Sequence, residues 1–476
     1  MRDAERHLSR RRMLRSAAGL AGLAVLSACG GASSTAPVSN TPASGGAAAG
    51  STSVPGATSV PTTAPASGGK MITLRFSARM GDKEAFFTER IATFQMQNPG
   101  VTVKYEPLPA ADAEYYPKLQ VLSATKNLPD VFWASIGRSS YQFLADKGVL
   151  RDLEPLLKSS NLDLNQFYPN AITSLRINGK LFAMPQTVHS GRSMLFYNKT
   201  AWEKAGLKLP DYNYTYDQLA QDAQKIVTSG GAQFGFSGVY GGTDDFLATL
   251  IPIRAFGGEV LSPDGKKCLL DSKEALAAVQ WMADGFQKTK INPLPVQGQD
   301  VNAGNADLFA NGKIASFQAS YGGEFSPTDK QLMGGIVRAS ALMPKGPSGK
   351  HGTMFEINCM AMSPTSANAD MAWKFLTFLV GKESGTIVTK TTGAPGGVKD
   401  GWNDPDLMAN PLQQVEKQSL DEAGPFIGPA NFKGEKFNTT MSQLMGEIWL
   451  GKSQPADALP GITKQLQAIL DEPVQQ

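Results

Sequence analysis

The chain has 476 residues, of which 18% are charged, and a formal net charge of +3 at neutral pH. The positive excess lies in the first 15 residues, which hold six arginines against Asp3 and Glu5. The rest of the chain carries about −1 and has no basic block interleaved with aromatic residues, which argues against a nucleic-acid-binding protein.

Residues 1–28 have the pattern of an export signal. A basic flank, "SRRRMLR" at 9–15, precedes an apolar run at 16–28 that is too short to span a bilayer. The flank resembles a twin-arginine signal, and the "LSAC" that ends at Cys29 resembles a bacterial lipobox. We therefore expect cleavage before Cys29, a lipid on its sulfur, and a location on the outer face of the bacterial cytoplasmic membrane.

Residues 29–69 are predicted to form the lipid anchor and a disordered tether. The forty residues after Cys29 carry no charge, and 36 of them are Gly, Ala, Ser, Thr or Pro. Such a segment has too few apolar groups to offset the entropy of ordering, and its random-coil end-to-end distance is roughly 35 Å.

Residues 70–476 are too many for one hydrophobic core, so two domains are expected. Strand patterns alternate with helix patterns from the start, which indicates βαβ units and parallel sheet. The predicted strands are 72–77, 101–107 and 130–134, and the predicted helices are 83–97, 115–124, 215–227, 272–286 and 367–380.

The segment "INGKLFAMPQTVHSGRSMLFYNKTAWEKAGL" (177–207), followed by "YTYDQLAQDAQKI", resembles the central signature of the family 1 extracellular solute-binding proteins. These are the sugar-capturing components of ABC importers, and maltose-binding protein is one of them. Supporting stretches such as "NLPDVFWAS" and "FANGKIASFQASYGG" extend the similarity, in order, through nearly all of 70–476.

The resemblance implies two α/β lobes that close on a ligand, each with a mainly parallel sheet flanked by helices. Lobe 1 would comprise 70–188 plus about 353–400, and lobe 2 would comprise 189–352 plus about 401–476. The chain would cross between them near 188–196, return near 351–355, and cross again after Pro395, with C-terminal helices such as 462–470 covering lobe 2. The implied partners are a small sugar and the permease subunits of an ABC importer. We expect a monomer without a cofactor or metal, held to the membrane only through the Cys29 lipid.

Ligands of open α/β sheets sit at the carboxyl ends of the strands. Sugars need flat aromatic surfaces for their C–H faces and paired polar groups for their hydroxyls. Together with the family alignment, this rule predicts that the following residues bind the ligand: Arg79, Trp133, Ser135, Arg138, His189, Tyr240, Asp244, Asp245, Tyr321, Gly322 and Phe355.

Tyr321 takes the place of a sugar-stacking Trp in the family alignment. Core packing is the alternative for Trp133 and Tyr321, and it is the expected role of Trp373, which lies on an apolar helical stripe. Arg79, Arg138 and His189 would bind sugar hydroxyls or an anionic group such as a uronate or phosphate.

Two cysteines remain beyond the leader, Cys268 and Cys359. The resemblance places them in different lobes, and a disulfide would tie together two lobes that must move. We therefore expect two free, buried thiols.

Two patterns that suggest an enzyme are set aside. "GEIWLGKS" (446–453) has P-loop spacing but continues an apolar helical pattern, so it is expected to be a helix ending at Gly451. The pair Asp244-Asp245 is expected to cap a helix rather than flank a glycosidic bond. We expect a non-enzyme; a secreted carbohydrate-active hydrolase and a polysaccharide-binding surface lipoprotein remain the alternatives.

Overall fold

The computed structural model describes residues 71–81, 83–136, 140–238, 245–294, 301–320, 330–392 and 395–474. The chain divides into two units, Met1–Ser67 and Gly68–Gln476, and all described residues belong to the second. The export signal, Cys29 and the tether lie outside the described residues, so their predictions are not tested here.

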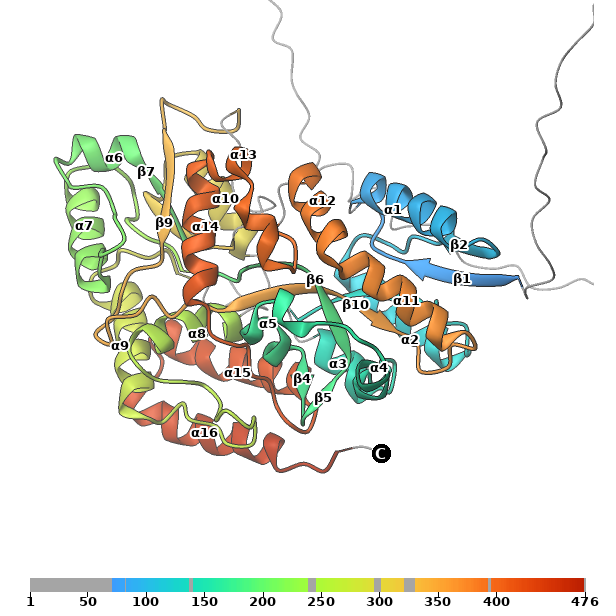
Figure 1. Ribbon diagram of the computed structural model, residues 1–476. Helices are drawn as coiled ribbons and strands as arrows, with labels where there is room; N and C mark the ends of the chain where they lie inside the picture. Colours follow the sequence, from blue (N-terminus) through green and yellow to red (C-terminus); the bar gives the residue numbers. More distant parts are fainter. Residues whose placement is uncertain are drawn as a thin grey trace, which may run out of the picture. The chain divides into compact units, whose positions relative to one another are not determined.

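A five-stranded sheet with the order β2-β1-β3-β10-β6 forms one half of the second unit (Figure 1). β1 pairs in parallel with β2 and β3, whereas β10 runs antiparallel to both β3 and β6. The strands are β1 (Ile72–Ser77), β2 (Val101–Tyr105), β3 (Val131–Ser135), β6 (Ala183–Ser190) and β10 (Phe355–Met362). The first three lie within two residues of their predicted bounds.

Helices cover this sheet as the periodicity predicts. α1 (Glu84–Gln97) buries Phe87, Ile91 and Phe94 on one face, and the chain turns at Gly100 with φ +89°. It packs against β2, α11 (Ala369–Val380) and α12 (Lys382–Thr392), and Trp373 of α11 is 7% exposed, which confirms its expected core role. α2 (Asp112–Ala124) begins three residues before its predicted start.

A second sheet, with the order β8-β7-β9, forms the other half, together with α6 (Lys199–Lys204), α7 (Tyr216–Thr228), α9 (Lys273–Gln287) and α10 (Val301–Ala310) (Figure 1). Its strands are β7 (Met194–Asn198), β8 (Ser316–Ala319) and β9 (Arg338–Leu342), and both pairings are antiparallel. The prediction of a mainly parallel sheet is therefore wrong for these strands. β7 enters directly from the other sheet and not through a crossover helix, so the βαβ rule does not set its direction.

The chain passes from one sheet to the other after β6 and returns before β10. β6 ends at Ser190 in one sheet and β7 begins at Met194 in the other, and the return lies between β9 and β10. After α12 the chain borders β6 again, where the Val188 amide donates to the Pro395 carbonyl at 2.8 Å. α14 (Pro411–Glu422) then packs against both β6 and β9. The protein thus has two α/β lobes; their residue boundaries stay a prediction.

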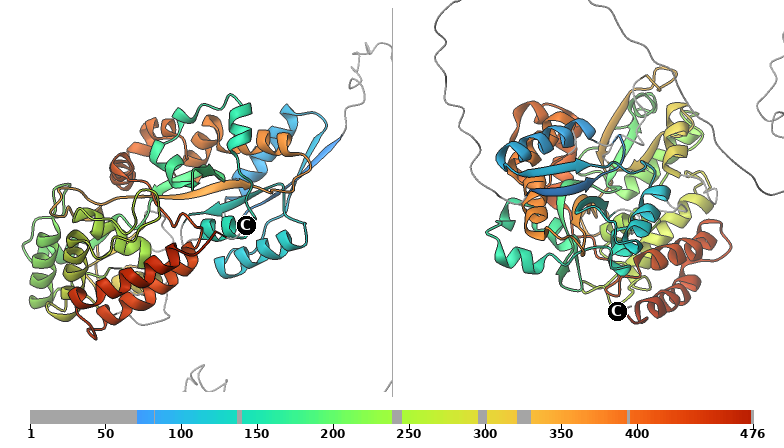
Figure 2. Two further views of the ribbon diagram at one scale, coloured as in Figure 1. Left: turned by 90° about the horizontal axis from the view of Figure 1, so that it is seen from below. Right: turned by 90° about the vertical axis from the view of Figure 1, so that its right-hand side faces the viewer.

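The C-terminal helices α15 (Gly434–Trp449) and α16 (Pro455–Leu470) lie side by side, as the red helices of Figure 2 show. α16 packs on α9, and α15 packs on α8 (Asp245–Ala255), α9 and α3 (Ser140–Asp146). α15 ends at Trp449, and Gly451 follows with φ +74°, so the helix expected in place of a P-loop is confirmed. The remaining short elements include α4 (Glu154–Ser159), α5 (Pro169–Ser174), β4 (Arg176–Ile177), β5 (Lys180–Leu181) and α13 (Pro405–Met408).

Cys268 and Cys359 are free and buried, which confirms the prediction. Burial raises the pKa of the Cys268 thiol to about 11 and raises that of Cys359 still further. The Cys359 thiol donates to the Ala134 carbonyl at 3.3 Å. Both side chains therefore act as small, uncharged parts of the core.

Candidate functional site

Four of the predicted ligand residues gather at one edge of the five-stranded sheet. Arg79 follows β1, Trp133 and Ser135 end β3, and His189 lies at the end of β6. Because β3 and β6 are both antiparallel to β10, they run in the same direction, and their carboxyl ends meet at this edge. These residues therefore lie at the carboxyl ends of the strands, where ligands of open α/β sheets bind.

Phe355, which begins β10, is opposite Ser190 and so reaches the same edge. The structure does not describe the side chains of the other predicted ligand residues, so their role stays a prediction. They are Arg138, Tyr240, Asp244, Asp245, Tyr321 and Gly322.

Arg79 and Trp133 are in contact. The Arg79 guanidinium lies 5.2 Å from the centre of the Trp133 ring, and its Nε donates to the Ala110 carbonyl at 2.6 Å. Trp133 is only 2% exposed, and its ring packs edge-on against Tyr115 at 5.5 Å. The Tyr115 hydroxyl also donates to the Trp133 carbonyl at 2.8 Å. Core packing, the alternative for Trp133, is the arrangement seen here, and its contact with a ligand stays a prediction.

His189 faces a carboxylate that the sequence analysis missed. It lies opposite Glu356 in the β6–β10 register, with 3.9 Å between Nδ1 and Oε2, and both side chains are about 15% exposed. An imidazole beside a carboxylate offers a donor and acceptors for neighbouring hydroxyls. Phe355, by contrast, is 1% exposed and packs against Tyr168 at 5.3 Å, so it contributes to the core.

Glu416 of α14 is a second carboxylate that the sequence analysis missed. It is fully buried, and its two oxygens accept hydrogen bonds from the Ser190 amide and hydroxyl, each at 2.5 Å. Burial raises the pKa of Glu416 to about 8, and the nearby Glu356 charge acts in the same direction. Glu416 therefore keeps its proton to a higher pH than an ordinary glutamate does, and it joins α14 to the end of β6. No local signal marks it, because its partner is 226 residues away.

Arg192 also lies in the crossing between the sheets and was not singled out from the sequence. Its φ is +55° and it is 2% exposed. Its Nη1 donates to the Ser320 hydroxyl at 2.9 Å, and its carbonyl accepts from Gln318 Nε2 at 2.8 Å. These bonds join the crossing to the end of β8, just before the position of Tyr321. The only feature of the sequence that could have pointed to Arg192 is its place after Gly191 at a predicted crossing between the lobes.

Within the described ranges, no group of three or more His, Cys, Asp or Glu side chains is arranged to hold a metal ion. Over the same ranges, no helix has the length and hydropathy needed to cross a membrane.

Two α/β lobes linked by strand crossings, with aromatic and polar groups at a carboxyl edge, have the architecture of a two-lobed solute receptor. The family model of the bacterial extracellular solute-binding proteins matches residues 77–386, and the chain belongs to this family. The family and the structural neighbours are binding proteins and not enzymes.

Similar proteins span nearly the whole described chain. A Brucella abortus protein described as a binding protein is 28% identical over 414 residues, which cover 84% of this chain and 93% of the relative. The cyclic α-maltosyl-1,6-maltose binding protein of Arthrobacter globiformis matches with a TM-score of 0.71 and 18% identity, covering 84% of this chain and 99% of the neighbour. The sugar-binding protein MalE of Xanthomonas citri matches with a TM-score of 0.69 and 20% identity. This match covers 84% of this chain and 97% of the neighbour.

Proposed function

We propose that this protein is an extracytoplasmic solute-binding lipoprotein that captures a mono- or oligosaccharide between two closing lobes and delivers it to the permease subunits of an ABC importer. The observation that carries the proposal is the match of the solute-binding family to 77–386, across both sheets. The sugars bound by the Arthrobacter and Xanthomonas neighbours support carbohydrate as the ligand class.

The charges at the sheet edge favour a neutral sugar over an anionic one. Glu356 beside His189 can accept from sugar hydroxyls, whereas its charge would repel a uronate or phosphate. Arg79 is already engaged with the Ala110 carbonyl and the Trp133 ring. A neutral sugar therefore suits these described groups better than an anion does.

A thermal-shift screen tests the ligand class. One ligand at about 100 times its dissociation constant adds roughly 2.7 kcal/mol to stability, which raises the melting temperature by several degrees. We expect a soluble neutral mono- or oligosaccharide to give this shift, and small-angle scattering to show compaction with it. Glu356→Gln should lower the affinity for that sugar several-fold, whereas Glu203→Gln, on exposed α6, should not.

A role for Tyr321 can be measured in the same screen. If its ring stacks on the sugar, Tyr321→Ala should abolish most of the shift and leave the unliganded melting temperature nearly unchanged. If only amino acids, peptides or polyamines raise the melting temperature, the ligand is not a carbohydrate, but the protein is still a solute receptor. Shifts with uronates or sugar phosphates alone would refute the preference for a neutral sugar, and turnover of a glycan would favour a hydrolase.

The lipid anchor is tested separately. If Cys29 carries the lipid, Cys29→Ser should give soluble protein outside the cytoplasm, or uncleaved precursor at the membrane. Detergent partition of the intact chain and the variant measures this. Normal processing of the variant with unchanged partition would rule out the lipobox.

A further inference from the structure

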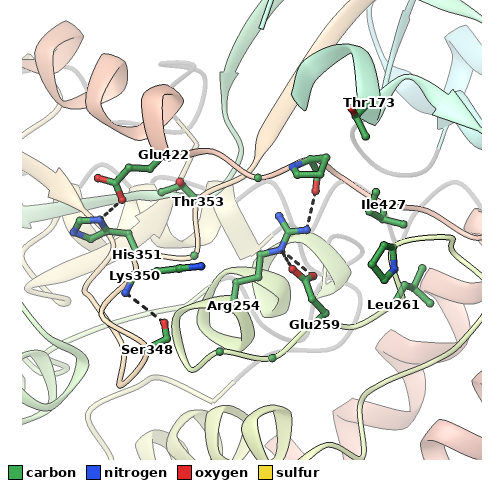
Figure 3. A pocket seen from close by; sticks show the side chains of 16 residues that line it. Thr173, Arg254, Glu259, Leu261, Ser348, Lys350, His351, Thr353, Glu422 and Ile427 are labelled. Carbon is green, nitrogen blue, oxygen red and sulfur yellow. Dashed lines mark hydrogen bonds and ion pairs between the residues drawn. The ribbon is translucent and has the colours of Figure 1, made fainter. Parts of the chain in front are cut away.

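A cavity of about 590 Å³ is lined by none of the predicted ligand residues. Its walls come from α5, the carboxyl end of α8 with 257–263, the return crossing at 348–353, and the end of α14 with 424–427 (Figure 3). Arg254, in this cavity, is nine residues along α8 from Asp245, or about 14 Å by helical rise. The cavity therefore lies at the opposite end of α8 from Asp245.

Arg254 forms part of the cavity wall, and one of its three guanidinium nitrogens has no hydrogen-bond acceptor within the ranges that the structure describes. Its side chain is 9% exposed, its Nε pairs with Glu259 at 2.9 Å, and its Nη2 donates to the Pro425 carbonyl at 2.7 Å. Among the described residues, nothing accepts a hydrogen bond from Nη1. The hydroxyl of Thr353, which also lines the cavity, likewise has no partner in the described part of the chain. An ordinary buried guanidinium is fully hydrogen-bonded, so this one lacks an acceptor.

A second ion pair lines the cavity. His351 is 1% exposed, and its Nδ1 and Nε2 lie 2.8 Å from Glu422 Oε2 and 2.9 Å from the Tyr212 carbonyl. Both ring nitrogens face acceptors, an arrangement that an imidazolium satisfies. Burial alone would raise the pKa of Glu422, but the hydrogen bonds from His351 and Tyr212 outweigh it and hold this pKa below its ordinary value. The pair is therefore hydrogen-bonded within itself, and both ring nitrogens of His351 are occupied.

Lys350 adds a positive charge to the cavity wall that has no acidic partner among the described residues. Arg254 is paired with Glu259, whereas no described residue pairs with the exposed ammonium group of Lys350. Figure 3 shows Lys350 and Arg254 extending toward the same space. The unpaired Nη1 of Arg254 and the unpaired ammonium group of Lys350 together favour an anion there.

We propose that this cavity binds a small organic monocarboxylate. A carboxylate matches the edge of a guanidinium and the charge of Lys350, and it would supply the acceptor that Nη1 lacks. Glu259 and Glu422 disfavour a dianion such as phosphate. Leu261, Pro263 and Ile427 provide apolar surface for an aromatic or aliphatic tail, and the volume lies in the range of small-molecule sites.

Titration calorimetry of the full chain with 3-phenylpropionate tests the site, with the neutral 3-phenylpropanamide as the matched ligand. We expect saturable binding of one acid per chain and at least about tenfold weaker binding of the amide, because the amide lacks the charge that both cations face. No saturable binding of the acid at millimolar concentration, or equal binding of acid and amide, would overturn the proposal.

Two variants locate the binding. Lys350→Gln should weaken binding of the acid several-fold, whereas Lys464→Gln, on the exposed face of α16, should not change it. Gly424 is not in a left-handed conformation, and a Cβ added there would lie 3.1 Å from Arg254 Nη1, so Gly424→Ala should cover this nitrogen and abolish binding. Unchanged melting temperatures establish that the variants fold. Unchanged affinity in both Lys350→Gln and Gly424→Ala would place the acid elsewhere and refute the site.

Discussion

Trp133→Ala is expected to lower the free energy of unfolding by about 3–5 kcal/mol, the range measured for truncation of buried aromatic residues. The ring is 2% exposed, packs edge-on against Tyr115 and lies under the Arg79 guanidinium, so truncation leaves a cavity that this rigid strand cannot close. Urea denaturation of the unliganded protein measures the change.

Val121→Ala is the matched control, because Val121 is 57% exposed on α2, which also carries Tyr115. It should change the free energy of unfolding by less than about 0.5 kcal/mol. If Trp133→Ala is equally mild, the ring is not a structural element of the core. A mild effect on stability with loss of the sugar-induced shift would establish it as a ligand contact instead.

We expect the stability of the intact chain to fall as the pH rises, and we expect Glu416→Gln to abolish this fall. Burial raises the pKa of Glu416 from 4.5 to about 8, so between these values the folded chain holds a proton that the unfolded chain has released. Stability therefore falls with rising pH in this window, by up to about 1.4 kcal/mol per pH unit. Glutamine keeps an acceptor for the Ser190 amide and a donor for its hydroxyl, and it does not titrate.

The measurement is the difference in unfolding free energy between variant and intact chain at pH 5, 6.5 and 8. This difference should grow in favour of Glu416→Gln by roughly 2–4 kcal/mol from the lowest to the highest pH. Glu203→Gln, on the surface of α6, should give a constant difference. Parallel pH profiles for Glu416→Gln and the intact chain would show that Glu416 is ionised throughout and that its burial does not control its proton.

Site residues at the ends of predicted strands could be found from the sequence, whereas residues that matter through contacts with distant parts of the chain could not. Arg79, Trp133 and Ser135 could be placed at one edge because the ends of predicted strands are local features, and parallel strands present those ends together. His189 was included through the family resemblance. Glu356 and Glu416 could not be found in this way. Glu356 matters because it pairs across from His189, and Glu416 because it meets Ser190, a contact between residues 226 apart.

The sequence by itself determined the local elements and the family. Period-two and helical patterns are set by which face of a strand or helix is apolar, so β1, α1 and β2 could be bounded closely, and α15 could be distinguished from a P-loop. The burial of Cys268 and Cys359 was also predicted from the sequence. Only the tertiary structure decided the direction of β7, β8 and β9, the core position of the Trp133 ring, and the raised pKa of Glu416. Each of these depends on which distant segments pack together, and strand direction, burial and pKa are set by those neighbours rather than by the residues adjacent in the chain.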